Sequence, residues 1–379
     1  MPIYELTVER IVAGGMGLMR SPVGVLLAPD LAPGDRVRVR AAGGVRAEVI
    51  ELVAPGSDRV QPPCEYYGEC GGCDFQHLSY RAQLTAKRGI VADALSRIAG
   101  MQLDETAIAV HASPPFGYRR RARFHRTAGG RLGFRARASE RVVPVDRCLV
   151  LHDSLNRMLT TGSKPDAAAE LAAIAAEHGV VSGSNDATVA LGPIRLTTRP
   201  TLFFQANFEL LPQLQRSLGE AAQRTAPAGS HLDVVDLYAG VGLLGRLIAA
   251  TTPIGTLLAV ESVAAAAGYA RRNLAACATD LHVVVGRAER VAARPEVQTL
   301  MSSACVVVDP PRAGLAKALR RQLLDRSPPT LVYLSCDPAT LARDVSQLQD
   351  AFEIRSIEVF DFFPQTAHVE TLVIMERRR

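Results

Sequence analysis

The sequence predicts an α/β protein of three parts, whose C-terminal half is a parallel sheet covered by helices on both faces. Three observations lead to this prediction. Short β-type runs separated by glycine and proline fill residues 1–57, a cysteine-rich and then arginine-rich segment occupies 58–194, and strand-like and helix-like stretches alternate within 195–379. The length of 379 residues also fits two or three domains of average size.

Residues 1–57 are typical of a small OB-like β-barrel. Glycine pairs lie where tight barrel corners are needed, and Pro55-Gly56 closes the unit. Barrels of this kind bind oligonucleotides in some proteins and are purely structural in others. The predicted strands cover 4–10, 23–28, 37–40 and 46–52.

The rest of the chain changes from a mixed to an alternating pattern. Strands are predicted at 119–125, 132–137 and 194–198, and an alanine-rich helix at 166–177. From residue 234 onward strands alternate with helices, and the last two strands lack a helix between them, which allows an antiparallel final pair. The strands of this region are 234–238, 256–261, 282–285, 305–308, 331–335, 354–360 and 371–375, and its helices are 242–250, 264–276, 316–325 and 338–349.

The composition is that of an ordinary globular protein. Hydrophobic residues make up 48% and charged residues 21% of the chain, so neither long disorder nor a fibrous repeat is expected. The apolar runs are far shorter than the ~18 residues that cross a bilayer, and the first residues show no signal pattern. We therefore expect a cytoplasmic protein without a membrane partner and, in the absence of any oligomer signal, a monomer.

Basic charge is concentrated in the central part. The net charge is only +5, yet ten arginines and two acids lie between residues 117 and 147. Guanidinium groups bind phosphates bidentately and stay charged, so this segment is a candidate RNA-binding surface; a solvated arginine-rich surface is the alternative. The ten residues are Arg119, Arg120, Arg121, Arg123, Arg126, Arg131, Arg135, Arg137, Arg141 and Arg147.

A glycine-rich loop follows the first strand of the alternating region. Asp236-Leu-Tyr-Ala-Gly-Val-Gly-Leu-Leu-Gly245 lies between that strand and a helix, and Glu261 ends the next strand. Glycines let the backbone approach a ligand closely, and an acid at that position can accept hydrogen bonds from ribose hydroxyls. The pattern alone fits NAD, FAD or S-adenosylmethionine.

Three further loops at later strand ends carry reactive side chains. Asp309-Pro-Pro-Arg312 follows the fourth strand, and its prolines keep Asp309 out of a helix. Cys336 ends the fifth strand just before a helix beginning near Pro338, and we expect that helix N-terminus to lower the pKa of the thiol. A buried, inert cysteine is the alternative. Glu370 enters the last strand.

Five segments occur in the order found in the S-adenosylmethionine-dependent RNA uracil C5-methyltransferases, and together they resemble that family over 195–379. They are Phe203-Phe-Gln-Ala-Asn207, the glycine loop, Asp309-Pro-Pro-Arg312, Ser335-Cys-Asp-Pro338 and His368-Val-Glu370. The resemblance implies a class I, Rossmann-like methyltransferase domain and contacts to S-adenosylmethionine. By similarity Gln205, Tyr238, Glu261 and Asp309 contact the cofactor, Cys336 is the nucleophile and Glu370 the proton acceptor.

The chemistry of uracil methylation gives an independent reason for a thiol and a base. Uracil C5 is a poor nucleophile, but addition of the Cys336 thiolate at C6 gives an enolate with electron density at C5. A base such as Glu370 must then remove the C5 proton. The target base must leave its stack to reach the pocket. Family members that carry both a barrel and a cluster often act on ribosomal RNA, so the resemblance implies 23S rRNA as the substrate of this chain, with tRNA as the alternative.

The chain departs from some members of the family at two positions. Gly286-Arg287-Ala288 stands where some relatives have an acidic or amide contact to the cofactor, and Leu243 replaces a polar residue. Neither contact is therefore assigned to this chain.

Four cysteines form a second candidate site. Cys64, Cys70 and Cys73 are separated by five and two residues, and Cys148 follows later. A disulfide framework is unexpected in a cytosolic chain, and the spacing leaves zinc and an iron–sulfur cluster open. The ribosomal-type members of the family look the same here, and the resemblance implies a [4Fe-4S] cluster on these four cysteines, with a structural or RNA-binding role, and a TRAM-like barrel before it. Cys277 and Cys305 are predicted core residues.

Other classes of function fit less of the sequence. Amino-group methyltransferases have an aromatic residue where Arg312 stands and need no thiol. A silent RNA-binding protein needs neither Cys336 nor Glu370, and a dehydrogenase would leave the Asp-Pro-Pro-Arg and Ser-Cys-Asp-Pro segments without a role.

Overall fold

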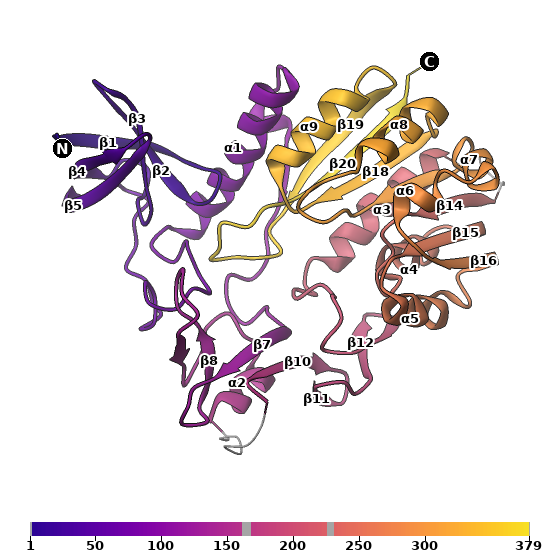
Figure 1. Cartoon of the computed structure of the whole chain (residues 1–379), viewed down its shortest axis with the longest axis horizontal. Coiled ribbons are helices and arrows are strands. Elements are labelled where there is room, and N and C mark those ends of the chain that lie inside the picture. The colour runs from indigo at the N-terminus through magenta and orange to yellow at the C-terminus, as the bar shows by residue number, and fades with distance from the viewer. Residues whose placement is uncertain (1, 161–167, 226–230, 379) are drawn as a thin grey trace.

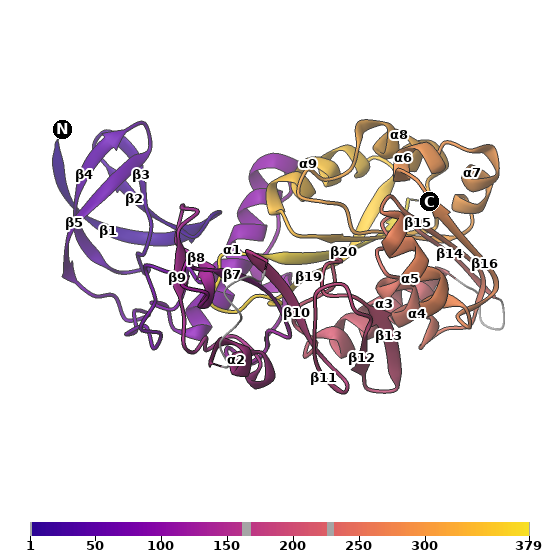
Figure 2. The ribbon, with the colours of Figure 1, turned by 60° about the horizontal axis from the view of Figure 1, so that its bottom comes forward.

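The computed structural model describes residues 2–160, 168–225 and 231–378. A β-barrel lies at one end of the molecule, the long helix α1 (Tyr80–Ala99) lies between the barrel and a large α/β body, and the central sheet lies below them in the view of Figure 1 (Figures 1 and 2). No helix in the described ranges is long and apolar enough to cross a membrane.

The N-terminal barrel is confirmed as a closed sheet of five strands in the order β1-β2-β3-β5-β4. Its interior holds Val8, Met19, Leu26, Val37 and Val39, all almost fully buried. The strand at Met16–Ser21 was not predicted, because three successive residues of it are buried and its pattern lacks the usual alternation. The strands are β1 (Ile3–Val12), β2 (Met16–Ser21), β3 (Gly24–Ala28), β4 (Arg36–Gly43) and β5 (Arg46–Ala54).

A five-stranded antiparallel sheet forms the central part, in the order β11-β10-β7-β8-β9. The predicted alanine-rich helix at 166–177 is wrong in its described portion, because Glu170–Ala176 is strand β10 and pairs with β7 and β11 on its two edges. Pairing and the burial of Ile174 outweigh the helix propensity of alanine. Residues 166 and 167 lie outside the described ranges. The other elements are β7 (Arg121–Arg126), β8 (Leu132–Arg135), β9 (Val142–Pro144), β11 (Gly179–Ser182) and α2 (Asp153–Thr160).

The C-terminal body contains an eight-stranded sheet in the order β16-β15-β14-β17-β18-β20-β19-β6. All seven predicted strands are confirmed. The antiparallel arrangement of the last pair is also confirmed, because β20 runs against both β18 and β19. The strands are β14 (Leu232–Asp236), β15 (Ile254–Glu261), β16 (Ala278–Val285), β17 (Cys305–Val308), β18 (Thr330–Ser335), β19 (Phe352–Phe360), β20 (Glu370–Arg377) and the edge strand β6 (Ala109–His111).

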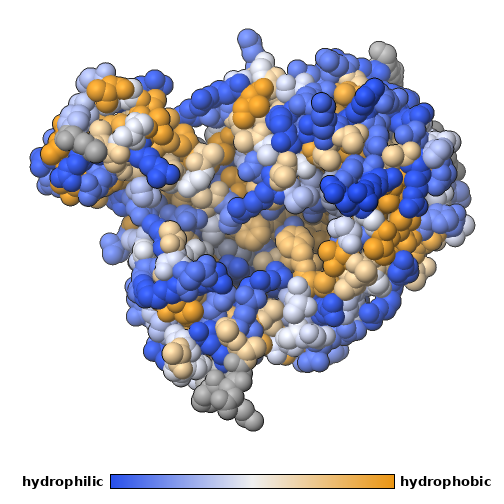
Figure 3. Space-filling model, in the orientation of Figure 1, coloured by the Kyte–Doolittle hydropathy of each residue, from blue (hydrophilic) through white to orange (hydrophobic). Residues whose placement is uncertain are grey.

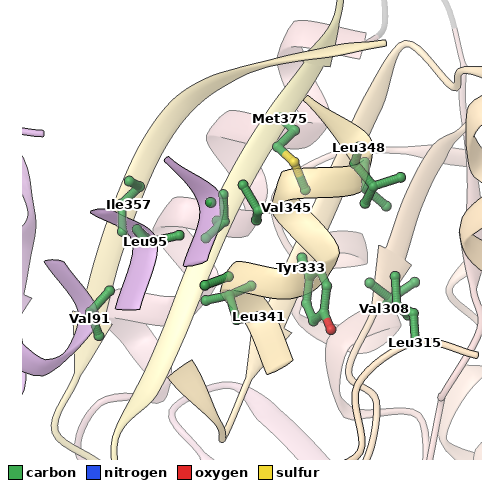
Figure 4. Packing of buried hydrophobic residues seen from close by; sticks show 14 of the residues in the cluster. Val91, Leu95, Val308, Leu315, Tyr333, Leu341, Val345, Leu348, Ile357 and Met375 are labelled. Atoms are coloured by element: carbon green, nitrogen blue, oxygen red, sulfur yellow. The ribbon is translucent and has the colours of Figure 1, made fainter. Parts of the chain in front are cut away.

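Helices cover both faces of the large sheet, as predicted. One apolar cluster packs α1, α6, α7, α8 and α9 on one face, and a second packs α3, α4 and α5 on the other. Figure 4 shows part of the first cluster, with Leu95 of α1 near Leu341 and Val345 of α9. The helices are α1 (Tyr80–Ala99), α3 (Leu211–Thr225), α4 (Leu243–Ala249), α5 (Ala264–Leu274), α6 (Ala288–Val291), α7 (Pro295–Met301), α8 (Lys317–Arg326) and α9 (Pro338–Leu348), with a 3-10 turn η1 (Glu105–Ala107).

Two elements of residues 58–194 belong to the large body. Helix α1 packs on α9, and β6 pairs with β19 at the edge of the sheet. Helix α1 begins at a cap in which the Ser79 side chain accepts a hydrogen bond from the Ala82 N–H, and it ends at Gly100 with φ 67°. A separate hairpin, β12 (Ala187–Leu191) and β13 (Ile194–Thr198), packs on α5.

Candidate active site

One cavity of about 850 Å³ lies at the carboxyl ends of the parallel strands. Its volume is within the range of cofactor and substrate sites. The face drawn in Figure 3 is hollowed near its centre, between the barrel, the central sheet and the large body. The structure brings all six predicted site residues into the lining of this active-site cavity: Gln205, Tyr238, Glu261, Asp309, Cys336 and Glu370.

The glycine loop between β14 and α4 forms one wall of the cavity. Gly240 and Gly242 have φ values of 55° and 90°, and a Cβ on Gly242 would lie 2.9 Å from Leu274. The Glu261 carboxylate accepts hydrogen bonds from the Gly240 N–H at 3.0 Å and the Val263 N–H at 2.7 Å. These bonds hold the loop and the end of β15 together beside the cavity.

Gln205 presents an unsatisfied acceptor. Its side chain is buried, and its Oε1 has no hydrogen-bond partner among the described residues. Buried amide oxygens in folded proteins almost always have a partner, so this one is suited to a donor on a ligand.

Acidic groups gather around the cavity, and the arginines that line it with them, Arg287 and Arg312, do not offset the effect of burial on their pKa values. Burial, together with Asp236, raises the pKa of Asp309 to about 7. Burial and then Asp309 raise the pKa of Glu370 to about 8. Asp236 lies behind the glycine loop, where burial raises its pKa to about 7 against the smaller opposing effect of the backbone N–H groups of Tyr238 and Gly245. Such a group of carboxyls favours a positively charged ligand.

Cys336 lies at the end of β18, two residues before the first residue of α9. The prediction that the helix N-terminus lowers the pKa of this thiol is wrong. Burial, followed by the charges of Glu370 and Asp309, raises it to about 11, and the opposing effect of Arg312 is smaller. A cation bound among these carboxyls would reduce the penalty on the thiolate.

Asp344 of α9 joins strand β18, which precedes Cys336, to the loop that carries Asp309. Its buried carboxylate accepts hydrogen bonds from the Tyr333 hydroxyl at 2.7 Å and the Leu315 N–H at 2.8 Å. A Cβ at Gly314, whose φ is 72°, would lie 2.6 Å from this carboxylate. Sequence reasoning missed Asp344, because its partners lie 11 and 29 residues away.

Several cavity residues were not predicted. Phe203 lines the cavity while 66% of its surface remains exposed, which is unusual for a large aromatic side chain. Arg287 also lines it, in the segment for which no contact was assigned. Arg312 Nη2 lies 3.2 Å from His368 Nδ1 at the cavity wall. These residues lie in or beside the sequence motifs, which was a signal for a role in the site. The motifs alone, however, do not show which of their side chains face the cavity.

The four predicted metal ligands line a second, smaller cavity, the cysteine cavity. Cys64, Cys70, Cys73 and Cys148 are all free thiols, and the lining between them is mainly aromatic and aliphatic. Burial raises the pKa of Cys73 to about 12, with further contributions from the other three thiols. Within the described ranges, no three His, Cys, Asp or Glu side chains are placed to hold a single metal ion.

The two remaining cysteines, Cys277 and Cys305, were predicted to be core residues, and this is confirmed. Cys305 is fully buried in β17, and Cys277, after α5, is 7% exposed. Cys277 Sγ lies 3.6 Å from Arg246 Nη1.

The arginine-rich segment is largely engaged within the molecule. Six of its ten arginines form ion pairs with acids of the chain, most of them exposed. Exposed pairs stabilise a fold by only about 0–1 kcal/mol, so phosphate oxygens can replace the carboxylates at little cost. The six are Arg120, Arg123, Arg131, Arg135, Arg137 and Arg141.

Comparisons with known proteins agree with the fold and with the predicted family. The sequence profile of the tRNA (uracil-5-)-methyltransferase family matches residues 202–378. Two curated relatives named 23S rRNA (uracil(1939)-C(5))-methyltransferase RlmD are similar over 98% of this chain and 89% of their own: that of Chromohalobacter salexigens is 33% identical and that of Halomonas elongata 31%.

A solved structure shares the whole fold. It is the tRNA (uracil-54, C5)-methyltransferase of Pyrococcus abyssi in complex with S-adenosyl-L-homocysteine, with a TM-score of 0.74 and 24% identity over 98% of this chain and all of that one. The chain belongs to the RNA uracil C5-methyltransferase family. It is an enzyme that methylates C5 of uracil in RNA.

Proposed function

We propose that this enzyme transfers a methyl group from S-adenosylmethionine to C5 of a specific uridine in 23S rRNA, by addition of a Cys336 thiolate to uracil C6. The observation that carries the proposal is that Cys336, Glu370 and the glycine loop line one cavity. The two relatives named for 23S rRNA favour the ribosomal substrate over tRNA. The family's name and the archaeal structure keep tRNA as the alternative.

The cavity suits the proposed methyl donor. Gln205, Tyr238, Glu261 and Asp309 would hold it, since an unpaired amide oxygen and two carboxylates fit a ligand with N–H and O–H donors and a positive charge. When bound, S-adenosylmethionine supplies an electrophilic methyl group on a sulfonium sulfur.

The chain's own residues carry the bond changes. The Cys336 thiolate forms a bond to C6, and the electron pair of the C5=C6 bond moves through C5 toward the C4 oxygen. C5 then forms a bond to the methyl group, and the electron pair of the broken S–CH3 bond stays on the donor's sulfur. The Glu370 carboxylate takes the proton left on C5, the C5–H electron pair restores C5=C6, and the C6–S bond breaks to release the thiolate.

The shifted pKa values set a condition on these reaction steps. With the cavity empty, the Cys336 thiol and the Glu370 carboxyl are both mainly protonated at neutral pH, because their pKa values are about 11 and about 8. A positive charge beside Asp309 and Glu370 lowers the pKa of the Cys336 thiol and so prepares the nucleophile. That charge is lost when the methyl group is transferred, so Glu370 removes the C5 proton with its raised pKa.

The other two parts of the chain are assigned to RNA binding and to a cluster. We assign residues 1–57 to a TRAM-like RNA-binding barrel, 58–194 to the cluster-bearing central domain and 195–379 to the methyltransferase domain. The cysteine cavity suits a [4Fe-4S] cluster, because four free thiols surround one space with an apolar lining. Metal analysis tests this: about four iron and four sulfide per chain support the cluster, and about one zinc overturns it.

The function is tested by methyl transfer from labelled S-adenosylmethionine to unmodified 23S rRNA and, separately, to unmodified tRNA, followed by nucleoside analysis. Wild-type enzyme is expected to give 5-methyluridine in the ribosomal RNA only, and Cys336→Ala none. A methylated adenine or cytosine, or full activity of Cys336→Ala, contradicts the proposal. Product in tRNA alone replaces the proposed substrate.

A further inference from the structure

The loop between β19 and β20, residues 361–369, is held in place by the central part of the chain. It contributes Phe363 and His368 to the active-site cavity and leads directly into Glu370. The hydrogen bonds that fix it come mainly from residues 74–118, outside the span matched by the family profile.

Asp74 makes the central contact to this β19–β20 loop. The N–H groups of Asp74 and Phe75 both donate to the Gln365 carbonyl oxygen at 2.9 Å, and the Asp74 Oδ2 accepts the Ala367 N–H at 3.0 Å. Gln365 is one of few residues other than glycine with a positive φ, at 69°. Such a conformation costs free energy and persists where neighbouring contacts hold it.

Helix α1 supplies a second set of contacts. The Gln83 side chain accepts the Gln365 N–H at 2.9 Å and donates to the Gln365 Oε1 at 3.0 Å. Lys87 Nζ lies 2.6 Å from Asp361 Oδ1 and donates to the Phe363 carbonyl oxygen at 2.9 Å, and both members of this ion pair are fully buried. The loop is therefore packed and bonded on the side away from the cavity.

The chain segment that ends at Asp74 also forms part of the wall of the cysteine cavity. Asp74 directly follows Cys73, which lines that cavity, and the Asp74 carbonyl oxygen accepts the Tyr67 hydroxyl at 2.7 Å. Tyr67 itself lies between Cys64 and Cys70 and also lines the cavity. One short stretch of chain thus contacts both the thiol cavity and the loop that precedes the proposed base.

We propose that Asp74 is a positioning residue for the last step of the reaction: it holds the β19–β20 loop so that Glu370 meets the C5 proton of the methylated adduct. The inference rests on the proposed role of Glu370. This role would link the cysteine segment to catalysis, because any contact that holds Cys73 in place also holds the adjacent Asp74, which in turn holds the loop.

The inference predicts which step of the reaction fails when the contact is removed. Asp74→Ala removes the acceptor of the Ala367 N–H and lets the loop move, so that proton removal slows after methyl transfer has occurred. The covalent protein–RNA adduct then accumulates by about tenfold or more, the expected size for a displaced base, while the first methyl-transfer burst stays near the wild-type rate. Asp74→Asn keeps an oxygen acceptor and is expected to restore most of the wild-type behaviour.

The experiment uses the full-length, metal-loaded enzyme and 23S rRNA in single-turnover reactions. Adduct is measured by denaturing gel, and amide exchange is followed in the peptide spanning 363–369. Asp74→Ala is expected to raise both adduct and exchange at unchanged metal content. Glu65→Ala is the matched control, since it is exposed in the same cysteine segment and, among the described residues, forms no hydrogen bond or ion pair with the loop.

Two results overturn the inference. One is unchanged exchange of the 363–369 peptide in Asp74→Ala, a readout that remains valid if activity is lost. The other is a burst rate that falls as far as turnover, which indicates a general structural defect. Glu370→Gln separates the two claims: if it accumulates adduct and Asp74→Ala does not, only the role of Asp74 fails; if it accumulates none, the proposed function fails and this inference with it.

Discussion

The two cavities of this enzyme are both lined by partly buried cysteines, yet they differ in what surrounds the thiols. In the active-site cavity carboxyl groups add to burial and raise the pKa of Cys336 to about 11. In the cysteine cavity the neighbours are other thiols, mainly apolar side chains, Gln76 and two arginines, and burial raises the pKa of Cys73 to about 12. Each environment disfavours a free thiolate, so each site needs a positive charge to ionise it.

The kind of positive charge differs accordingly. Carboxyls around a large open cavity suit an organic cation that enters and leaves with each turnover, while the four thiols around the cysteine cavity suit the cluster proposed above, which would stay bound. Substitutions in the two cavities should therefore have separable effects, on the reaction in one and on metal content in the other.

Removal of the Cys336 thiol is expected to have the largest effect. Cys336→Ala should lower methyl transfer by about 10⁴-fold or more, because the route through the C6 adduct is lost, while metal content stays unchanged. Radiolabel transfer and iron analysis on one preparation check both statements. Cys277→Ala is the control, since that buried thiol lies outside both cavities; equal losses in the two variants would contradict the account.

Removal of a thiol from the cysteine cavity should act on the metal and the fold instead. Cys148→Ser is expected to lose the proposed cluster and to lower the thermal unfolding midpoint by about 5 °C or more, because a bound metal centre stabilises the folded state. Calorimetry with iron and sulfide analysis measures this. Full retention of metal and midpoint would remove Cys148 from the ligand set.

The pH dependence sharpens the contrast further. Glu370 has a raised pKa of about 8, so its carboxylate form grows between about pH 6 and pH 9. The rate of adduct resolution should rise by about 10- to 100-fold over this range, and Glu370→Gln should abolish the rise. Stopped reactions at fixed ionic strength test it; a rate that falls with increasing pH contradicts the role of Glu370 as a base.

The same raised pKa predicts a change in stability. Below the unfolded-state pKa near 4.5 the Glu370 carboxyl is neutral in both the folded and the unfolded state. As the pH rises from there through about 8, the unfolded chain ionises freely while the folded enzyme must keep the proton or bury a charge, so the free energy of unfolding falls. Glu370→Gln should therefore raise the free energy of unfolding by about 1–3 kcal/mol at pH 9 and have little effect at pH 4. Denaturant titration of the cofactor-free enzyme at both pH values measures the difference; no pH dependence would show that burial is not the cause.

The smallest effect is expected in the arginine-rich segment. Arg141 pairs with Glu69 at 2.9 Å with both side chains more than half exposed. Arg141→Ala should change the free energy of unfolding by no more than about 1 kcal/mol while weakening RNA binding at low salt. A loss of stability well above this value would mean that the pair is structural and not exchangeable with phosphate.

The sequence predicted the active-site cavity well because its parts are local. Glu261, Asp309 and Cys336 each end a strand, and parallel strands bring such ends to one edge. What it could not predict depends on distant neighbours. Asp344 and the carboxyl environment of Cys336 are set by tertiary contacts, and that environment outweighs the local effect of the α9 N-terminus.

The structure of the central part was harder to predict from the sequence for the same reason. Strand β10 has an alanine-rich sequence that favours a helix, and it is a strand because β7 and β11 pair with it on both edges. Helix α1 was not predicted, and it packs on α9 across more than 200 residues of chain. The four cysteines were found by spacing, but their link to the β19–β20 loop through Asp74 becomes visible only in three dimensions.

The most direct test of the central claim is mass spectrometry of Glu370→Gln after reaction with S-adenosylmethionine and 23S rRNA. With the base removed, the enzyme should stall after methyl transfer, and digestion should yield a peptide in which Cys336 carries a 5-methylated, C6-linked uridine nucleotide. Absence of any adduct while methylated RNA still forms, or an adduct on a different residue, would contradict the mechanism in which Cys336 adds to uracil and Glu370 completes the reaction.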